Sequence, residues 1–253
     1  MNFKMNMITS TLLAAGFSLL AGSAAAQTCV ANNCAALGFT KSASNCEGDI
    51  IRCPFDTSKV FCKEKKVYAP KPGDILYSDG TISDSVIASK TPVGIVAYVN
   101  GSNGFAVSLT EVSKTWSSGY EDVSCLTNYS SSSKAMTDMN GKNNTMCLVN
   151  YSGSYSYPAA EYCNTFSAVS NGKGSSGWYL PAAGELYSMS FSYGAINLGL
   201  QKLSKTQISS NYYWSSSEYA NYGGAWNVRP SDGYMGGSLT KSNSRPVRCV
   251  LAL

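Results

Sequence analysis

Side chains that could carry out enzymatic chemistry are few in this sequence, and one type is missing altogether. The chain contains no histidine, which excludes Ser-His-Asp and Cys-His nucleophilic catalysis and every histidine-based metal site. A pair of carboxylates could still do acid–base work, but no two acidic residues stand at a spacing that singles them out. We therefore expect no enzyme activity, no catalytic residues and no cofactor.

A short polar segment is similar to the start of a calcium-binding loop. Asp138 and Asn140 place oxygen ligands two residues apart, and Gly141 follows them as a turn residue. The segment, which runs to Thr145, lacks the later bidentate glutamate of such a loop. We interpret it as a polar Asx-type turn and predict no metal site.

The cysteines are the next chemically informative residues. Nine are present, at positions Cys29, Cys34, Cys46, Cys53, Cys62, Cys125, Cys147, Cys163 and Cys249. In an oxidising compartment they predict a disulfide framework, and the odd number leaves one thiol free or paired covalently to a partner molecule. Zinc is the weaker alternative, because no CxxC pair occurs. Cys53 and Cys62 flank a segment that suits a local bridge, although sequence alone does not fix the connectivity.

Residues 207–245 have the composition of a binding surface. More than half of them are Ser, Tyr, Gly or Asn. Tyrosine provides a large rigid contact area at little entropic cost, and the small polar residues provide adaptable hydrogen bonds. The alternative is a set of ordinary polar loops on an exported β-rich protein. Our candidates for an exposed ligand-binding face are Tyr212, Tyr219, Asn221, Tyr222, Asn227, Arg229, Asp232, Tyr234 and Met235.

The first residues of the chain have the features of a secretory signal peptide. Lys4 supplies a positive charge, residues 8–20 are mainly apolar, and Ala24–Ala26 supply the small side chains that precede cleavage. We expect residues 1–26 to be removed, because the apolar stretch is shorter than the ~20 residues of a membrane-spanning helix. No second long apolar run follows, so no membrane insertion is expected after cleavage. The formal net charge of +4 is small and dispersed, which argues against a nucleic-acid partner.

Beyond the leader, two regions differ in composition. Residues 27–66 hold five of the nine cysteines and are predicted to form a small cysteine-rich module that depends on its bridges. A linker rich in lysine and proline, residues 63–72, leads into a larger domain, residues 67–253.

The larger domain begins with patterns typical of strands. Residues 74–77, 93–99 and 105–109 are rich in β-formers, and Asn100–Gly104 between the last two is a hairpin signal.

Two helices are predicted after these strands. Apolar residues at helical spacing predict one helix from Pro158 to Val169, ended by Asn171-Gly172. Pro181 begins the second helix, whose buried side includes Leu186, Met189 and Tyr193. Short strands and polar loops follow, so we predict an α+β fold.

Three groups of motifs in this domain match a known signature. They are Gly177–Pro181 with Gly184–Leu186, Tyr213–Glu218 with Ala225-Trp226, and Arg245–Cys249. Together they resemble the C-type-lectin-like domains of bacterial surface proteins, in particular the C-terminal domain type of a collagen-like adhesin, which is related to the formylglycine-generating-enzyme fold. The resemblance covers roughly residues 70–253 and implies a C-type-lectin-like fold with two helices and short antiparallel sheets.

The resemblance also implies two disulfides. In such a fold the first helix is bridged to the last strand, which here joins Cys163 to Cys249, and Cys125 with Cys147 closes a smaller loop. Formylglycine-generating enzymes need a reactive cysteine pair that holds copper, and this pairing leaves no spare pair in the late region. The calcium motifs of sugar-binding animal lectins are also missing from the sequence. The fold alone therefore implies neither oxidase activity nor calcium-dependent sugar binding.

Four further residues in these motifs receive structural roles. Trp178 and Trp214 are expected in the core rather than in contact with a ligand. For Arg245 and Arg248 we prefer an ion pair with Glu185 or Glu218 over the binding of an anion.

These features favour an exported protein, periplasmic, cell-surface or secreted, that acts like an adhesin. Its C-terminal loops are predicted to bind a host or cell-surface glycan or protein. The alternative is a fimbrial or pilus-associated structural subunit. In position and composition, residues 207–245 are also similar to the variable segment of proteins diversified by retroelements, which implies variation concentrated at adenine-containing codons.

Overall fold

The computed structural model describes residues 33–36, 38–42, 49–54, 56–63, 68–221 and 223–253. The chain divides into two units, of which the first ends at Val67 and the second begins at Tyr68. The predicted signal peptide, Cys29, Cys46 and Tyr222 lie outside the described residues.

The described part of the first unit is a small sheet closed by a disulfide. It consists of α1 (Asn33–Ala36), β1 (Lys41–Ser42), β2 (Asp49–Arg52) and β3 (Lys59–Lys63), with antiparallel strands in the order β1-β3-β2. Cys34 is bonded to Cys53, and both are buried together with Val60.

The predicted bridge between Cys53 and Cys62 is wrong, although Cys62 is also disulfide-bonded. The register of the β2–β3 hairpin explains why. Cys62 lies opposite Ile50, three residues before Cys53. Three residues of strand span about 10 Å, which is too far for a disulfide.

The centre of the second unit is a six-stranded antiparallel sheet. Its order is β10 (Trp178–Tyr179), β15 (Val250–Ala252), β7 (Asn103–Ser108), β6 (Pro92–Asn100), β4 (Ile75–Tyr77) and β5 (Ile82–Ser83). The β6–β7 pairing ends with Asn100 opposite Asn103, where the sequence predicts a hairpin.

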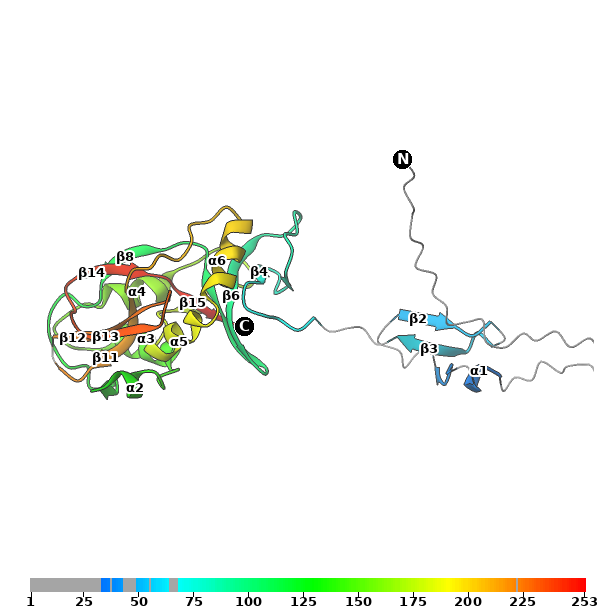
Figure 1. The fold of residues 1–253 in the computed structure, drawn as a ribbon, viewed down its shortest axis with the longest axis horizontal. Helices are drawn as coiled ribbons and strands as arrows, with labels where there is room; N and C mark the ends of the chain where they lie inside the picture. Colours follow the sequence, from blue (N-terminus) through cyan, green and yellow to red (C-terminus); the bar gives the residue numbers. More distant parts are fainter. Residues whose placement is uncertain (1–32, 37, 43–48, 55, 64–67, 222) are drawn as a thin grey trace, which may run out of the picture. The chain divides into compact units, whose positions relative to one another are not determined.

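Both faces of this sheet are covered. Successive side chains of a strand point to opposite faces. Accordingly Ile75, Tyr77 and Val107 belong to one hydrophobic cluster, and Leu76 and Ala106 belong to another. Figure 1 shows α6 (Tyr193–Lys202) alongside β6, and Ile196 and Leu200 of this helix pack in the first cluster.

Two smaller sheets complete the unit. One has the order β13 (Tyr234–Thr240), β12 (Gly224–Arg229), β11 (Tyr213–Tyr219) and β9 (Asn128–Tyr129), with β9 parallel to β11. The other pairs β14 (Ser244–Val247) with β8 (Val112–Thr115) in antiparallel fashion. Trp178 and Trp214 are buried, as predicted.

The helices agree with the sequence only in part. The two predicted helices correspond to α4 (Pro158–Thr165) and α5 (Ala183–Ser190). α4 ends before Val169 because Phe166 is extended. Three helices of the described second unit were not predicted: α2 (Ser132–Ala135), α3 (Gly141–Asn150) and α6.

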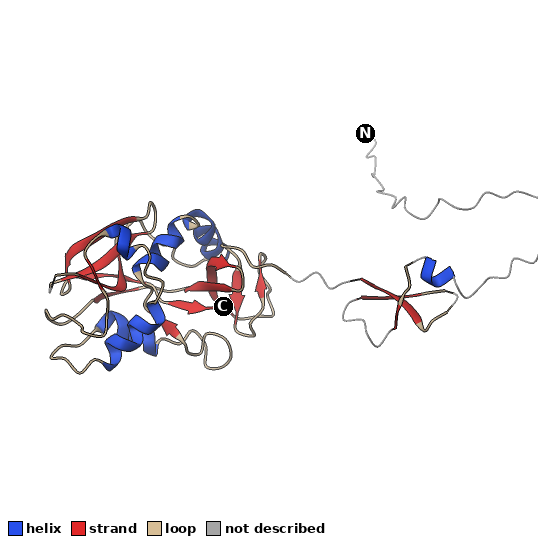
Figure 2. Ribbon diagram, turned by 90° about the horizontal axis from the view of Figure 1, so that it is seen from below, coloured by secondary structure: helices blue, strands red, loops and turns tan. Residues whose placement is uncertain are grey.

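The second unit therefore has the predicted α+β fold, with helices and strands mixed throughout, as Figure 2 shows. Within the described residues, no helix has both the length and the apolar character needed to span a membrane.

The second unit holds the two disulfides that the resemblance implies. Cys163 of α4 is bonded to Cys249, and Cys125 is bonded to Cys147 of α3. The first bond closes a loop with a sequence separation of 86 residues, whereas the second closes one of 22. The long-range bond ties α4 to the end of the chain.

A buried ion pair joins the smaller sheets to the loop that precedes residue 125. Lys241 and Glu218 are both fully buried, and the ammonium group donates to the Glu218 carboxylate. Lys241 Nζ also donates to the Glu121 carbonyl at 2.6 Å and lies 4.8 Å from the Trp116 ring centroid. The Val123 N–H donates to the same carboxylate at 3.0 Å. Burial raises the pKa of Glu218, and the Lys241 hydrogen bond opposes that rise.

Replacing Cys163 and Cys249 together with alanine is expected to lower the free energy of unfolding by about 4.5 kcal/mol, because the long loop becomes unconstrained in the unfolded chain. The same change at Cys125 and Cys147 is expected to cost less, about 3 kcal/mol, since its loop is shorter. Urea unfolding of both double variants measures the difference. A smaller loss from the longer loop would contradict this explanation.

Replacing Lys241 with methionine is expected to lower the free energy of unfolding by about 3–5 kcal/mol, because a buried carboxylate loses its counter-ion. Adding Glu218→Gln removes that charge, so the double variant is expected to recover part of the loss. Chemical denaturation at pH 7 gives the values. A double variant whose loss equals the sum of the two single losses would show that the two groups do not interact.

Candidate binding surface

Three of the predicted ligand-binding residues lie close together at one end of the four-stranded sheet, next to the start of β11, the end of β12 and the start of β13. Tyr212 directly precedes β11, Arg229 ends β12, and Tyr234 begins β13 opposite Arg229. The Arg229 guanidinium lies 5.3 Å from the Tyr212 ring centroid and 5.4 Å from that of Tyr234. The two rings stand edge to face, with their centroids 6.1 Å apart. Such distances are typical of cation–π contacts.

A fourth predicted residue, Asp232, fixes the arginine in place. Arg229 Nε donates to Asp232 Oδ1 at 2.9 Å, and Nη2 donates to Oδ2 at 2.5 Å. The Tyr234 N–H donates to the same carboxylate at 3.1 Å. These hydrogen bonds lower the pKa of Asp232 and raise that of Arg229. The pair neutralises itself and holds the turn between β12 and β13.

Arg245 of β14 adds a second guanidinium, which the sequence did not place here. It lies 5.8 Å from the Tyr212 ring centroid and 5.7 Å from that of Trp214. The residue is half-buried, and burial lowers its pKa. Its Nε atom is buried without a hydrogen-bond partner in the described part of the chain.

The end of α5 extends this surface with two more aromatic rings. Gly233 has a φ of +73°, and a Cβ atom there would lie 3.0 Å from the Tyr187 ring. The ring of Tyr187 stands edge to face with that of Phe191 at 5.2 Å. Phe191 is 76% exposed and Tyr234 is 59% exposed.

We call this group of residues the aromatic–arginine face: Tyr187, Phe191, Tyr212, Arg229, Asp232, Tyr234 and Arg245. It offers rigid rings, one arginine that Asp232 neutralises, and one arginine, Arg245, without an acidic partner among the described residues. Aromatic rings combined with a few polar groups are typical of recognition surfaces.

Other predicted binding residues do not belong to this face. Asn227 is fully buried, and Met235 is a core residue. Tyr219 packs edge to face on Trp226, with ring centroids 5.2 Å apart. Asn221 is exposed but lines a separate hollow of about 160 Å³ together with Tyr120, Gly223, Gly224 and Thr240.

The predicted ion pairs of Arg245 and Arg248 are wrong. Arg248 pairs with Glu111 at 3.3 Å, and Glu218 is engaged by the buried lysine. Glu185 accepts a hydrogen bond from the Tyr179 hydroxyl instead.

The segment compared with a calcium loop is an Asx-type turn, as predicted. The Asn140 N–H donates to Asp138 Oδ1 at 3.0 Å. Asp138 Oδ2 accepts from Asn144 Nδ2 at 2.9 Å and from the Ser217 hydroxyl at 2.6 Å. The carboxylate thus connects the start of α3 to β11.

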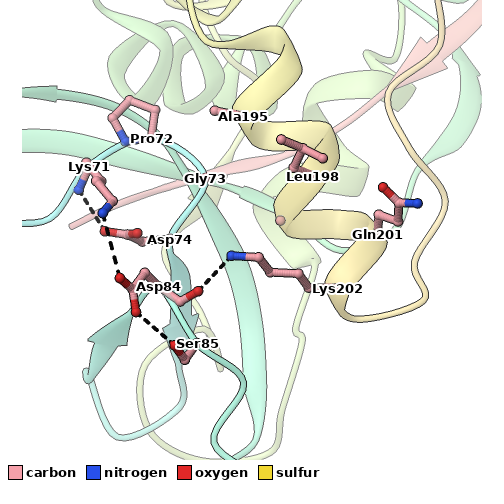
Figure 3. Close-up of a pocket in the computed structure, with 11 residues that line it drawn as sticks. Lys71, Pro72, Gly73, Asp74, Asp84, Ser85, Ala195, Leu198, Gln201 and Lys202 are labelled. Atoms are coloured by element: carbon pink, nitrogen blue, oxygen red, sulfur yellow. Dashed lines mark hydrogen bonds and ion pairs between the residues drawn. The ribbon is translucent and has the colours of Figure 1, made fainter. Parts of the chain in front are cut away.

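A larger hollow, of about 570 Å³, lies at the start of the second unit (Figure 3). Pro72 and Leu198 form part of its wall, and its charged groups contact one another. Lys71 lies 3.7 Å from the Asp84 carboxylate, and Lys202 Nζ donates to the Asp84 carbonyl at 2.7 Å.

A buried glutamate borders another hollow, of about 350 Å³. Glu185 is 4% exposed and accepts hydrogen bonds from Tyr179 Oη at 3.0 Å and from the Ala182 N–H at 2.8 Å. Burial raises the pKa of Glu185 to about 7, although these hydrogen bonds oppose the rise. A Cβ atom on Gly141 would lie 2.1 Å from the carboxylate, so this site is closely packed.

The comparisons with known proteins give a similarity in fold but no family. No protein-family model matches the sequence, and no curated protein is significantly similar to it. The chain is similar in structure to a fimbrial protein from Bacteroides ovatus, with 22% sequence identity and a TM-score of 0.56. The match covers 72% of this chain and 48% of that protein, so the chain corresponds to about half of its length. Even if the whole first unit, which ends at Val67, took part in the match, a coverage of 72% of the chain would still include more than half of the second unit.

The stability of the second unit is expected to fall as the pH rises from 4.5 to 7. In that range folded Glu185 keeps a proton that the unfolded chain has lost, because its pKa rises from 4.5 to about 7 on folding. The contribution of Glu185 to the free energy of unfolding is fully present below pH 4.5 and amounts to about 3 kcal/mol. Glu185→Gln is expected to flatten this part of the profile. Thermal and urea unfolding between pH 4 and 8 test it, and identical profiles for the two proteins would contradict the assignment.

Proposed function

We propose that this chain is an exported subunit of a bacterial surface fibre of the fimbrial type. The observation that carries the proposal is the likeness in fold to the Bacteroides ovatus fimbrial protein over 72% of the chain. The disulfides of both units support export, because such bonds persist mainly outside the cytoplasm. The predicted signal peptide agrees with this location.

A second function, adhesion, is favoured by the aromatic–arginine face. Its exposed tyrosine and phenylalanine rings are not needed to complete a core, and aromatic and arginine residues are typical of binding surfaces. We also propose that the second unit is a C-type-lectin-like domain. The bond between α4 and the end of the chain supports that topology. The two functions are compatible, since a fibre subunit can present a binding domain.

Immunogold electron microscopy of cells that express the full chain tests the first function. Antibodies against residues 68–253 are expected to label surface fibres, and the protein is expected in the material released by mechanical shearing. A variant without residues 1–26 is the matched control and is expected to remain inside the cell.

Two results would count against this function. Label confined to the cytoplasm would contradict export. Surface label without fibres, and no protein in the sheared fraction, would contradict the subunit role and leave adhesion as the better proposal.

A further inference from the structure

Arg245 differs from the other arginines of the second unit in its charge balance. Arg229 is paired with Asp232, and Arg248 is paired with Glu111. Across the described residues, no carboxylate lies within ion-pair distance of Arg245. The residue opposite it on β8 is Lys114, another cation. This edge of the face therefore carries uncompensated positive charge.

The rings around Arg245 hold its guanidinium in a defined position. Its contacts with Tyr212 and Trp214 restrict the side chain before any ligand arrives. Its Nε atom is buried and has no hydrogen-bond partner within the described chain, so the two Nη groups are the ones that a ligand can reach. A planar guanidinium held in this way is suited to bind a carboxylate through two parallel hydrogen bonds.

The surroundings of Arg245 favour a saccharide over a peptide. The face offers exposed rings, with Tyr234 the most accessible of the tyrosines around the arginines. A sugar can lay its apolar C–H face on such a ring, while the tyrosine hydroxyls and Asp232 bond its hydroxyl groups.

We propose that the aromatic–arginine face binds an acidic saccharide, with Arg245 bound to the sugar carboxylate and Tyr212 and Tyr234 packed against the sugar ring. The proposal deepens the adhesive function given above and rests on it. Arg229 has a different role, because its bonds to Asp232 position the two tyrosines.

Calorimetric titration of the full mature chain tests this proposal. The probes are sialyllactose and a hyaluronan oligosaccharide, each compared with its carboxyl-reduced counterpart. At least one acidic probe is expected to bind, and reduction of its carboxylate is expected to weaken binding at least tenfold. Arg245→Gln is expected to cause a similar loss, since a charge-assisted hydrogen-bond pair is removed.

Two variants separate binding from folding. Tyr234→Ser changes an exposed side chain, so it is expected to weaken binding severalfold without changing the unfolding temperature. Arg52→Gln makes the same chemical change as Arg245→Gln in the first unit and is expected to leave binding unchanged. Circular dichroism of each variant verifies the fold.

Several results would overturn the proposal. These are failure of both acidic probes to bind, equal affinity for the carboxyl-reduced probes, and full binding by a folded Arg245→Gln variant. Tighter, Arg245-dependent binding of a poly-glutamate peptide would assign the face to an acidic protein instead. These titrations use purified protein, so their outcome is independent of whether the cells display fibres.

Discussion

The buried ion pair between Lys241 and Glu218 is the interaction on which the second unit most depends. Both side chains are fully buried, and charges removed from water are stable only when their partners are in place. Those partners come from β11, from the segment between β13 and β14, and from the loop around Glu121. The pair therefore fixes the end of β11, which holds Glu218, against the segment that leads from β13 to β14. At the start of β11, Trp214 Nε1 donates to the Asn243 carbonyl of the same segment, and Tyr212 lies near Arg245 of β14.

On this framework the aromatic–arginine face is already organised without a ligand. Asp232 holds Arg229 between two tyrosine rings, so little conformational entropy remains to be lost there when a ligand binds. Arg245 differs from Arg229, because it contacts the Tyr212 and Trp214 rings but has no acidic partner in the described chain. Rigid rings and one available positive charge are the basis of both the adhesive proposal and the preference for an acidic sugar.

The sequence allowed the α+β class and part of this face to be predicted, because strand patterns and a region rich in tyrosine are local signals. It could not separate exposed from buried candidates. Asn227 lies on a central strand whose two faces are both covered. Met235 follows the exposed Tyr234 on β13, so its side chain points to the opposite face, into the core. Phe191 was missed since it joins the face only through the packing of α5 against the β12–β13 turn. The missing acidic partner of Arg245 is likewise a tertiary property, which motif spacing does not reveal.

The most direct test of the binding surface is nuclear magnetic resonance of the arginine side chains during titration with the acidic saccharides. The Nε–H signal of Arg245 is expected to shift as the ligand is added. The signal of Arg229 is expected to keep the slow hydrogen exchange of a group bonded to Asp232. A shift confined to Arg229, or unchanged signals from both arginines at saturating ligand, would contradict the proposed binding surface.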